Sequence, residues 1–93
     1  MKIGFSPLGV NIRSYVPISQ KAEELGYESV WWPEHLIFPE EIPITYPTVA
    51  SGNFPFKSDT PLLDPFLALS YIAGATQHLR LGTMVYILPL RDP

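Results

Sequence analysis

The amino-acid sequence predicts an α/β fold, namely the first βαβαβ portion of a (β/α)8 TIM barrel. Short apolar segments alternate with segments of helical period, and this alternation predicts a parallel sheet with right-handed crossovers. The expected strands are apolar at nearly every position, as in parallel strands covered on both faces or closed into a barrel. Barrel units average about 31 residues, so three units account for the 93 residues of the chain. We therefore expect residues 1–93 to be the N-terminal part of a longer barrel domain.

The first half of the chain holds two expected strands and one helix. The strands are the apolar runs 2–5 and 28–32, and Pro33 ends the second. Between them a helix starts near Ser14, and Gly26 supplies the left-handed residue that stops it. Helical spacing assigns to its buried face Tyr15, Ile18, Ala22 and Leu25.

The second half holds one more helix and one more strand. Asp64 followed by Pro65 is typical of a helix start, because aspartate caps the first turn and proline suits its first position. We expect this helix over 65–77, with His78 near its C-terminus, where the helix dipole favours a cation. Its expected buried face consists of Phe66, Leu69, Ile72, Ala73 and Thr76. The third strand is expected over 80–88.

The segment 36–63 is expected to be a long loop. It holds five prolines and no helical period. Connections longer than about 12–15 residues without regular structure are uncommon and usually functional. The alternative is a disordered insert, although the segment carries many apolar side chains for a solvated loop.

Composition excludes several classes of function. The net charge of −3 and the scattered basic residues argue against nucleic acid or an anionic membrane as partner. The chain has no cysteine, which excludes disulfides, thiolate metal sites and a cysteine nucleophile. Neither a targeting segment nor an apolar run long enough to cross a bilayer is evident. These features lead us to expect a cytoplasmic protein.

His35 is the first candidate for chemistry. It directly follows an expected strand, at the edge of the sheet where a barrel carries its active site. An imidazole there can act as general acid or base near neutral pH, or it can merely cap the strand end. The neighbouring Glu34 can orient that imidazole, form a buried ion pair, or be solvated. No metal site is expected, because adjacent residues at a strand end cannot both point the same way.

Two segments resemble the signature of the bacterial luciferase-like monooxygenase superfamily. They read AEELGYESVWWPEH at 22–35 and LRLGTMVYILPLRDP at 79–93. The Glu34-His35-Leu36 triplet, the Tyr-Pro and Phe-Pro pairs, and Asp64-Pro65-Phe66 resemble the branch that uses the deazaflavin coenzyme F420. The resemblance covers essentially the whole chain. It implies a flavin- or deazaflavin-dependent oxidoreductase or monooxygenase, of which this chain is roughly the first third.

The resemblance also implies roles for individual residues. FMN or F420 lies at the mouth of the barrel, and a small organic substrate is changed by hydride transfer or oxygenation. His35 binds the cofactor and moves a proton, and Glu34 orients His35 as the second catalytic residue. Met84 and Val85 bind the cofactor, joined by a non-prolyl cis peptide in a bulge behind its ring. The loop 36–63 becomes a lid or substrate wall, with candidate lining residues Trp32, Phe38 and Tyr46.

Association and alternative functions follow from the same comparison. The resemblance implies a homodimer that packs partly through the helix at 65–77. The isolated 93-residue chain is not expected to be catalytic, since barrels of this type hold the cofactor phosphate on later strands. The main alternative is a non-catalytic βαβαβ fragment that self-associates or pairs with a partner chain through its sheet edges. Another barrel enzyme, such as a sugar-phosphate isomerase, lacks support because neither a metal-ligand set nor a phosphate loop is visible.

Overall fold

A three-stranded parallel sheet forms the centre of the computed structural model. The strands are β1 (Gly4–Phe5), β2 (Ser29–Trp32) and β3 (Arg80–Thr83), and they lie in the order β1-β2-β3. This arrangement confirms the predicted parallel α/β unit, while its continuation into a closed barrel remains a prediction. The structure describes residues 1–37, 39–41, 50–52 and 56–92.

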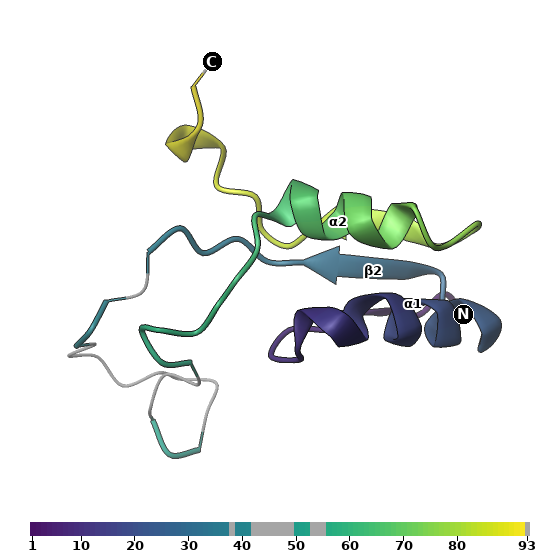
Figure 1. The fold of residues 1–93 in the computed structure, drawn as a ribbon, viewed down its shortest axis with the longest axis horizontal. Helices are drawn as coiled ribbons and strands as arrows, with labels where there is room; N and C mark the ends of the chain where they lie inside the picture. Colours follow the sequence, from purple (N-terminus) through teal and green to yellow (C-terminus); the bar gives the residue numbers. More distant parts are fainter. Residues whose placement is uncertain (38, 42–49, 53–55, 93) are drawn as a thin grey trace.

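Two helices connect the strands and pack on one face of the sheet. Helix α1 (Tyr15–Glu24) lies between β1 and β2, and helix α2 (Pro65–Ala73) lies between β2 and β3. The two helices flank β2 in the view of Figure 1. Short 3-10 turns, η1 (Ile12–Ser14) and η2 (Leu88–Leu90), lie before α1 and after β3. Within the described parts of 36–63 there is no helix or strand.

The helix ends follow the signals in the sequence. The Asp64 carboxylate caps α2 by accepting hydrogen bonds from the backbone N–H groups of Phe66 (2.9 Å) and Leu67 (3.3 Å). Pro65 occupies the first turn, where a missing N–H costs nothing. Gly26 follows α1 with a φ of 81°, in the left-handed region that a side chain disfavours. The predicted start and stop signals are therefore confirmed at these positions.

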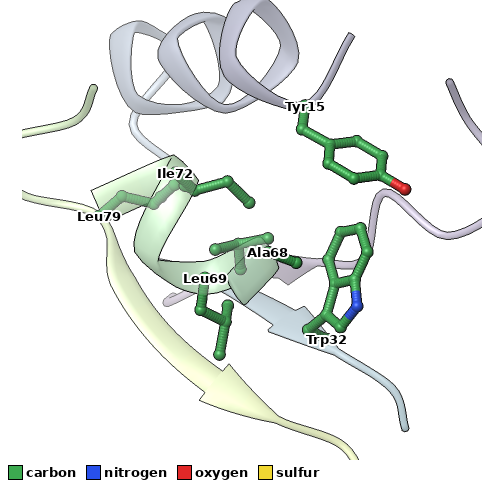
Figure 2. Packing of buried hydrophobic residues seen from close by; sticks show 7 residues of the cluster. Tyr15, Trp32, Ala68, Leu69, Ile72 and Leu79 are labelled. Atoms are coloured by element: carbon green, nitrogen blue, oxygen red, sulfur yellow. The ribbon is translucent and has the colours of Figure 1, made fainter. Parts of the chain in front are cut away.

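The core lies between the sheet and the two helices. Tyr15 of α1 and Trp32 of β2 meet edge to face, with ring centroids 4.6 Å apart (Figure 2). Helix α2 contributes three further side chains, Ala68, Leu69 and Ile72, to the same buried cluster. The buried hydrophobic cluster consists of Tyr15, Val30, Trp32, Ala68, Leu69, Ile72 and Leu79. The sheet is thus covered on the face to which Val30 and Trp32 point.

Three predicted features of the elements are wrong. Strand β3 ends at Thr83 rather than at residue 88, because its partner β2 ends before Pro33, which has no N–H to extend the ladder. Helix α2 ends at Ala73, so His78 lies in the loop beyond it and not at a helix end. The expected buried faces also shift, since exposed positions include Leu25, Phe66 and Ala73.

Trp32 does not line a ligand site, contrary to the prediction. Its side chain is fully buried in the core between the sheet and the helices. Side chains alternate between the two faces of a strand, so Trp31 faces the opposite side of the sheet. Phe38 and Tyr46, the other two predicted lining residues, lie outside the described residues. Among the described residues, no helix has the length and apolar character needed to cross a membrane.

Candidate functional site

The candidate site lies where the three strands end. Ser6 follows β1, His35 lies three residues beyond the end of β2, and Met84 follows β3. Because the strands are parallel, these residues all leave the sheet at the same edge. Figure 1 shows the segment after β2 and the turn η2 leaving at this common end. In parallel α/β folds, ligands bind outside the carboxyl ends of the strands.

An apolar hollow opens on the sheet face away from the helices. It encloses about 280 Å³ and is lined by Gly4, Phe5, Ser6, Trp31 and Met84. Three of the five lining residues therefore belong to the first strand and the residue after it. This volume lies slightly below the range of about 300–1,000 Å³ typical of whole ligand sites. The hollow has room for part of a ligand, such as one flat ring system.

Trp31 forms one wall of this hollow. Its indole N–H donates a hydrogen bond to the Ser29 hydroxyl at 2.9 Å. The ring lies close against the backbone of both neighbouring strands, at Gly4 and Gly82. A Cβ atom at Gly4 would lie 2.7 Å from the indole nitrogen, and one at Gly82 would lie 2.5 Å from ring atom Cζ3. Two glycines thus leave space for one indole that spans the sheet.

The Met84–Val85 peptide bond is cis, as the resemblance predicts. The Met84 N–H donates to the carbonyl of Trp32 at 2.9 Å, which extends the pairing with β2 by one bond. Both side chains are exposed. Met84 lines the hollow, whereas Val85 does not. The assignment of both residues to cofactor binding stays a prediction.

Glu34 forms the buried ion pair that was one of its predicted interpretations. Its side chain is only 1% exposed. One carboxylate oxygen accepts a hydrogen bond from the Ile87 N–H at 2.6 Å, and the other pairs with Nη2 of Arg91. Buried carboxylates need such partners, since an unpaired charge is costly away from water. The loop after β2 is therefore tied to the loop after β3.

Arg91 also reaches the start of α2. The same Nη2 lies 2.8 Å from the Asp64 carboxylate. The hydrogen bond from Arg91, together with the helix N–H groups, lowers the pKa of Asp64 below its ordinary value. The guanidinium lies over the ring of Tyr86, 5.1 Å from its centroid, and Tyr86 in turn meets Phe66 edge to face at 5.0 Å. Arg91 thus joins three segments where the strands end: the loop after β2, the start of α2 and the loop after β3.

His35 is exposed and directly follows the anchored Glu34. Its roles in proton transfer and cofactor binding, and the role of Glu34 in orienting it, stay predictions. No three histidine, aspartate or glutamate side chains in the described part of the chain are grouped to hold a metal ion.

The sequence did not single out Arg91, Asp64 or Trp31 as site residues. Asp64 was interpreted only as a helix cap, which it also is. Arg91 could have been found from its place in the segment after the third strand, because a charged residue there lies near the carboxyl ends of the strands, where parallel α/β folds bind ligands. The position of Trp31 on the face away from the helices follows from strand alternation once Trp32 is assigned to the core. The contact between Glu34 and Arg91 joins residues 57 positions apart and has no local signal.

The residues at the hollow fit a flat ring better than a charged group. Trp31 and Met84 supply apolar side chains to the lining, whereas the ring of Phe5 packs against the core on the other face of the sheet. Such a lining suits an aromatic ring system, as in small-molecule sites with mostly apolar walls. None of the five carries a charge that would pair with a phosphate. Within the described residues, the lining of the hollow therefore suits an apolar ring and offers no partner to an anion.

Comparison with known proteins gives a consistent result over the whole chain. A profile of the family described as luciferase-like monooxygenase matches residues 4–93. An uncharacterized protein of Mycobacterium tuberculosis and one of Mycobacterium bovis are each 28% identical over 93 residues, which covers 100% of this chain and 32% of theirs. A second uncharacterized protein of Mycobacterium tuberculosis is 29% identical over 72 residues, 77% of this chain and 26% of its own length.

The chain spans between about a quarter and a third of the length of these curated relatives. The names of these relatives state no activity. No solved structure matches the chain at a significant level.

Proposed function

The chain belongs to the luciferase-like monooxygenase family, and from this premise we propose that it forms the N-terminal portion of a (β/α)8 oxidoreductase. The proposed cofactor is FMN or coenzyme F420, and the proposed substrate is a small organic molecule. Membership of the family supports oxidoreductase chemistry in broad terms. The choice of cofactor, the substrate and the closed barrel are parts of the proposal.

One observation carries the proposal to specific residues. The apolar hollow beside Met84 opens at the same sheet edge from which His35 leaves β2. A ring held in the hollow therefore shares this end of the sheet with an imidazole, a group that can donate or accept a proton. This pairing of a ring-sized apolar surface with an acid–base group is what a redox reaction with coupled proton transfer requires.

In the proposed reaction each residue of this chain has a limited task. The bound cofactor supplies the electron or hydride transfer. Trp31 and Met84 hold the ring by apolar contact, and their surfaces exclude water from one side of it. His35 donates or accepts the proton that accompanies the change in the substrate. Segments beyond this chain bind the phosphate, because the described lining offers it no positive charge.

Equilibrium titration of the purified protein with FMN and with F420, followed by the fluorescence anisotropy of the cofactor, tests this proposal. We expect saturable binding of one of the two. Ser6→Phe fills the hollow and should weaken that binding by about tenfold or more. The matched control is Ser58→Phe, which introduces the same ring at an exposed turn outside the hollow. Absence of binding for both cofactors, or equal weakening by both variants, would contradict the proposal.

His35→Gln tests the proton-transfer role separately. With any substrate that the protein converts, this variant should lower kcat by about 10²–10⁴-fold, the usual contribution of general acid–base catalysis. The dissociation constant for the cofactor should change little, since ring contact is assigned to the hollow. A variant with unchanged kcat would remove His35 from the mechanism.

Homodimer formation through α2 is a further part of the proposal. The outward face of α2 carries Phe66, Leu67 and Tyr71, which are 54%, 65% and 50% exposed. An apolar helix face of this kind supports an interface. Sedimentation of wild type and Leu67→Glu should show a dimer that the charge dissociates, whereas a wild-type monomer would argue against it. Self-association without catalysis remains the alternative function, and a cytoplasmic location remains a prediction.

A further inference from the structure

The cluster of Glu34, Asp64 and Arg91 is more than a stabilising ion pair. We propose that Arg91 is a positioning residue for His35, because its guanidinium fixes the buried Glu34 from which His35 extends. The inference rests on the proposed function only for the identity of His35 as the reacting group. The contacts that carry it are independent of any cofactor.

The Glu34 carboxylate is fixed beyond the end of β2. Its side chain is 1% exposed, and both carboxylate oxygens are bonded to the segment after β3, at Ile87 N–H and Arg91 Nη2. A carboxylate held at both oxygens cannot rotate without breaking a bond in a buried place. The peptide bond from Glu34 to His35 is therefore held at a defined point beyond the end of β2.

Arg91 is itself anchored to other elements. Its Nη2 also pairs with Asp64 at 2.8 Å, and Asp64 is held in turn by two backbone N–H groups of α2. The guanidinium plane packs over Tyr86 at 5.1 Å. Arg91 is thus anchored on a helix N-terminus and on an aromatic ring. It transmits the position of these elements to Glu34.

Arginine suits this position better than lysine. Both carboxylates are bonded to one nitrogen, Nη2, while the guanidinium plane rests over the Tyr86 ring. The ammonium of lysine keeps the charge but has no plane to stack on an aromatic ring, and its flexible stem leaves it less fixed. Arg91 therefore does what charge alone cannot do, and Arg91→Lys should lose positioning while it keeps the charge. Small displacements of a reacting group cost much in rate, on the order of 10²-fold for about 1 Å.

Histidine C2–H hydrogen–deuterium exchange, measured by mass spectrometry on the purified protein without cofactor, tests the inference. The chain has two histidines. His35 reports on the anchored strand end, and His78 is an internal reference whose backbone N–H bonds to Glu23 instead. The variants are Arg91→Met and Arg91→Lys. A third variant, Glu34→Gln with Arg91→Met, removes both charges and so tests positioning without a buried unpaired carboxylate.

The expected result is a severalfold change in the His35 exchange rate in all three variants, with His78 unchanged. Equal changes at both histidines would mean that Arg91 only stabilises the fold, and would overturn the inference. Unchanged exchange at His35 in folded Arg91→Lys or in the double variant would overturn it as well. Should Arg91→Met fail to fold, these two variants still decide the question.

Failure of this inference is distinguishable from failure of the proposed function. Titration of the wild-type protein with FMN and F420 tests the function alone, since it does not involve Arg91 variants. If wild type binds neither cofactor while His35 exchange responds to substitution of Arg91, the positioning role of Arg91 is supported and the proposed redox function is contradicted. If wild type binds a cofactor while His35 exchange does not change on substitution of Arg91, the proposed function is supported and the positioning role of Arg91 is contradicted.

Discussion

The fit of Trp31 between two glycines gives the sharpest test of the described geometry. In Gly82→Ala, the new Cβ would lie 2.5 Å from Cζ3 and 2.6 Å from Cε3 of the Trp31 ring. Favourable carbon contacts begin near 3.5 Å, so the ring has to move away by roughly 1 Å. The backbone of β3 is held by its ladder with β2 and cannot yield as easily.

The cost of this shift follows from what Trp31 loses. Overpacking typically costs about 1–3 kcal/mol, and a broken hydrogen bond to Ser29 adds about 0.5–1.5 kcal/mol. The ring is 40% exposed and can swing outward, which limits the cost. The entropy lost by the unfolded chain on replacing glycine offsets about 0.4–1 kcal/mol. We therefore expect Gly82→Ala to lower the free energy of unfolding by about 1–2 kcal/mol.

Urea denaturation followed by far-ultraviolet circular dichroism measures this change. Gly74→Ala is the matched control, because its Cβ would meet nothing closer than 3.7 Å and its φ is −65°. That control should be neutral or stabilising by about 0.4–1 kcal/mol. In a Trp31→Ala background, Gly82→Ala should lose most of its cost. Equal destabilisation by Gly82→Ala with and without the indole would mean that the cost does not come from the contact with Trp31.

Other predictions concern the core, the caps and the pH dependence of stability. Ile72, which is fully buried, should lose about 2–5 kcal/mol on replacement by alanine and only about 0.5–1.5 kcal/mol by valine, measured by urea denaturation. Equal losses in Ile72→Ala and Ile72→Val would mean that the neighbouring side chains close the cavity left by alanine. Asp64→Ala should cost about 1 kcal/mol through the lost helix cap. Asp64→Asn keeps a capping oxygen and should recover most of that loss in thermal melts, whereas no recovery would assign the cost to the pair with Arg91. The Glu23 carboxylate accepts from the backbone N–H groups of His78, Leu79 and Gln77, which lower its pKa. Its stabilisation is therefore present at neutral pH and is lost as pH falls from the ordinary carboxyl value through the lowered one. Glu23→Gln should lower Tm at pH 7 and flatten its fall in acid, and an acid limb identical to wild type would contradict this assignment.

Local features of the fold were predictable because their causes are local. Asp64 followed by Pro65 dictates the start of α2, and Gly26 dictates the end of α1, through backbone chemistry that needs no tertiary partner. The parallel order of the strands follows from their alternation with helices. The length of β3 was not predictable in this way. It depends on the neighbouring strand, which ends before Pro33, rather than on its own apolar run.

The candidate site was predictable only in outline. Strand alternation and the sheet edge indicate where His35 and Met84 leave the sheet, because both follow strands directly or nearly so. The partners of Glu34 were not predictable, since the pair with Arg91 spans 57 residues and depends on how two loops meet. The three N–H groups that hold Glu23 are likewise 54 to 56 residues away. Side-chain networks of this kind arise from packing and leave no periodic signal in the sequence.

The most direct test of the central claim observes the hollow itself during cofactor binding. The chain has two methionines, so selective ¹³C-methyl labelling gives two signals, from Met1 and Met84. Met84 lines the hollow and Met1 does not. On titration with FMN or F420, the ring current of a cofactor in the hollow should shift the Met84 methyl signal and leave Met1 in place. A stationary Met84 signal at saturating concentrations of both cofactors would contradict the account.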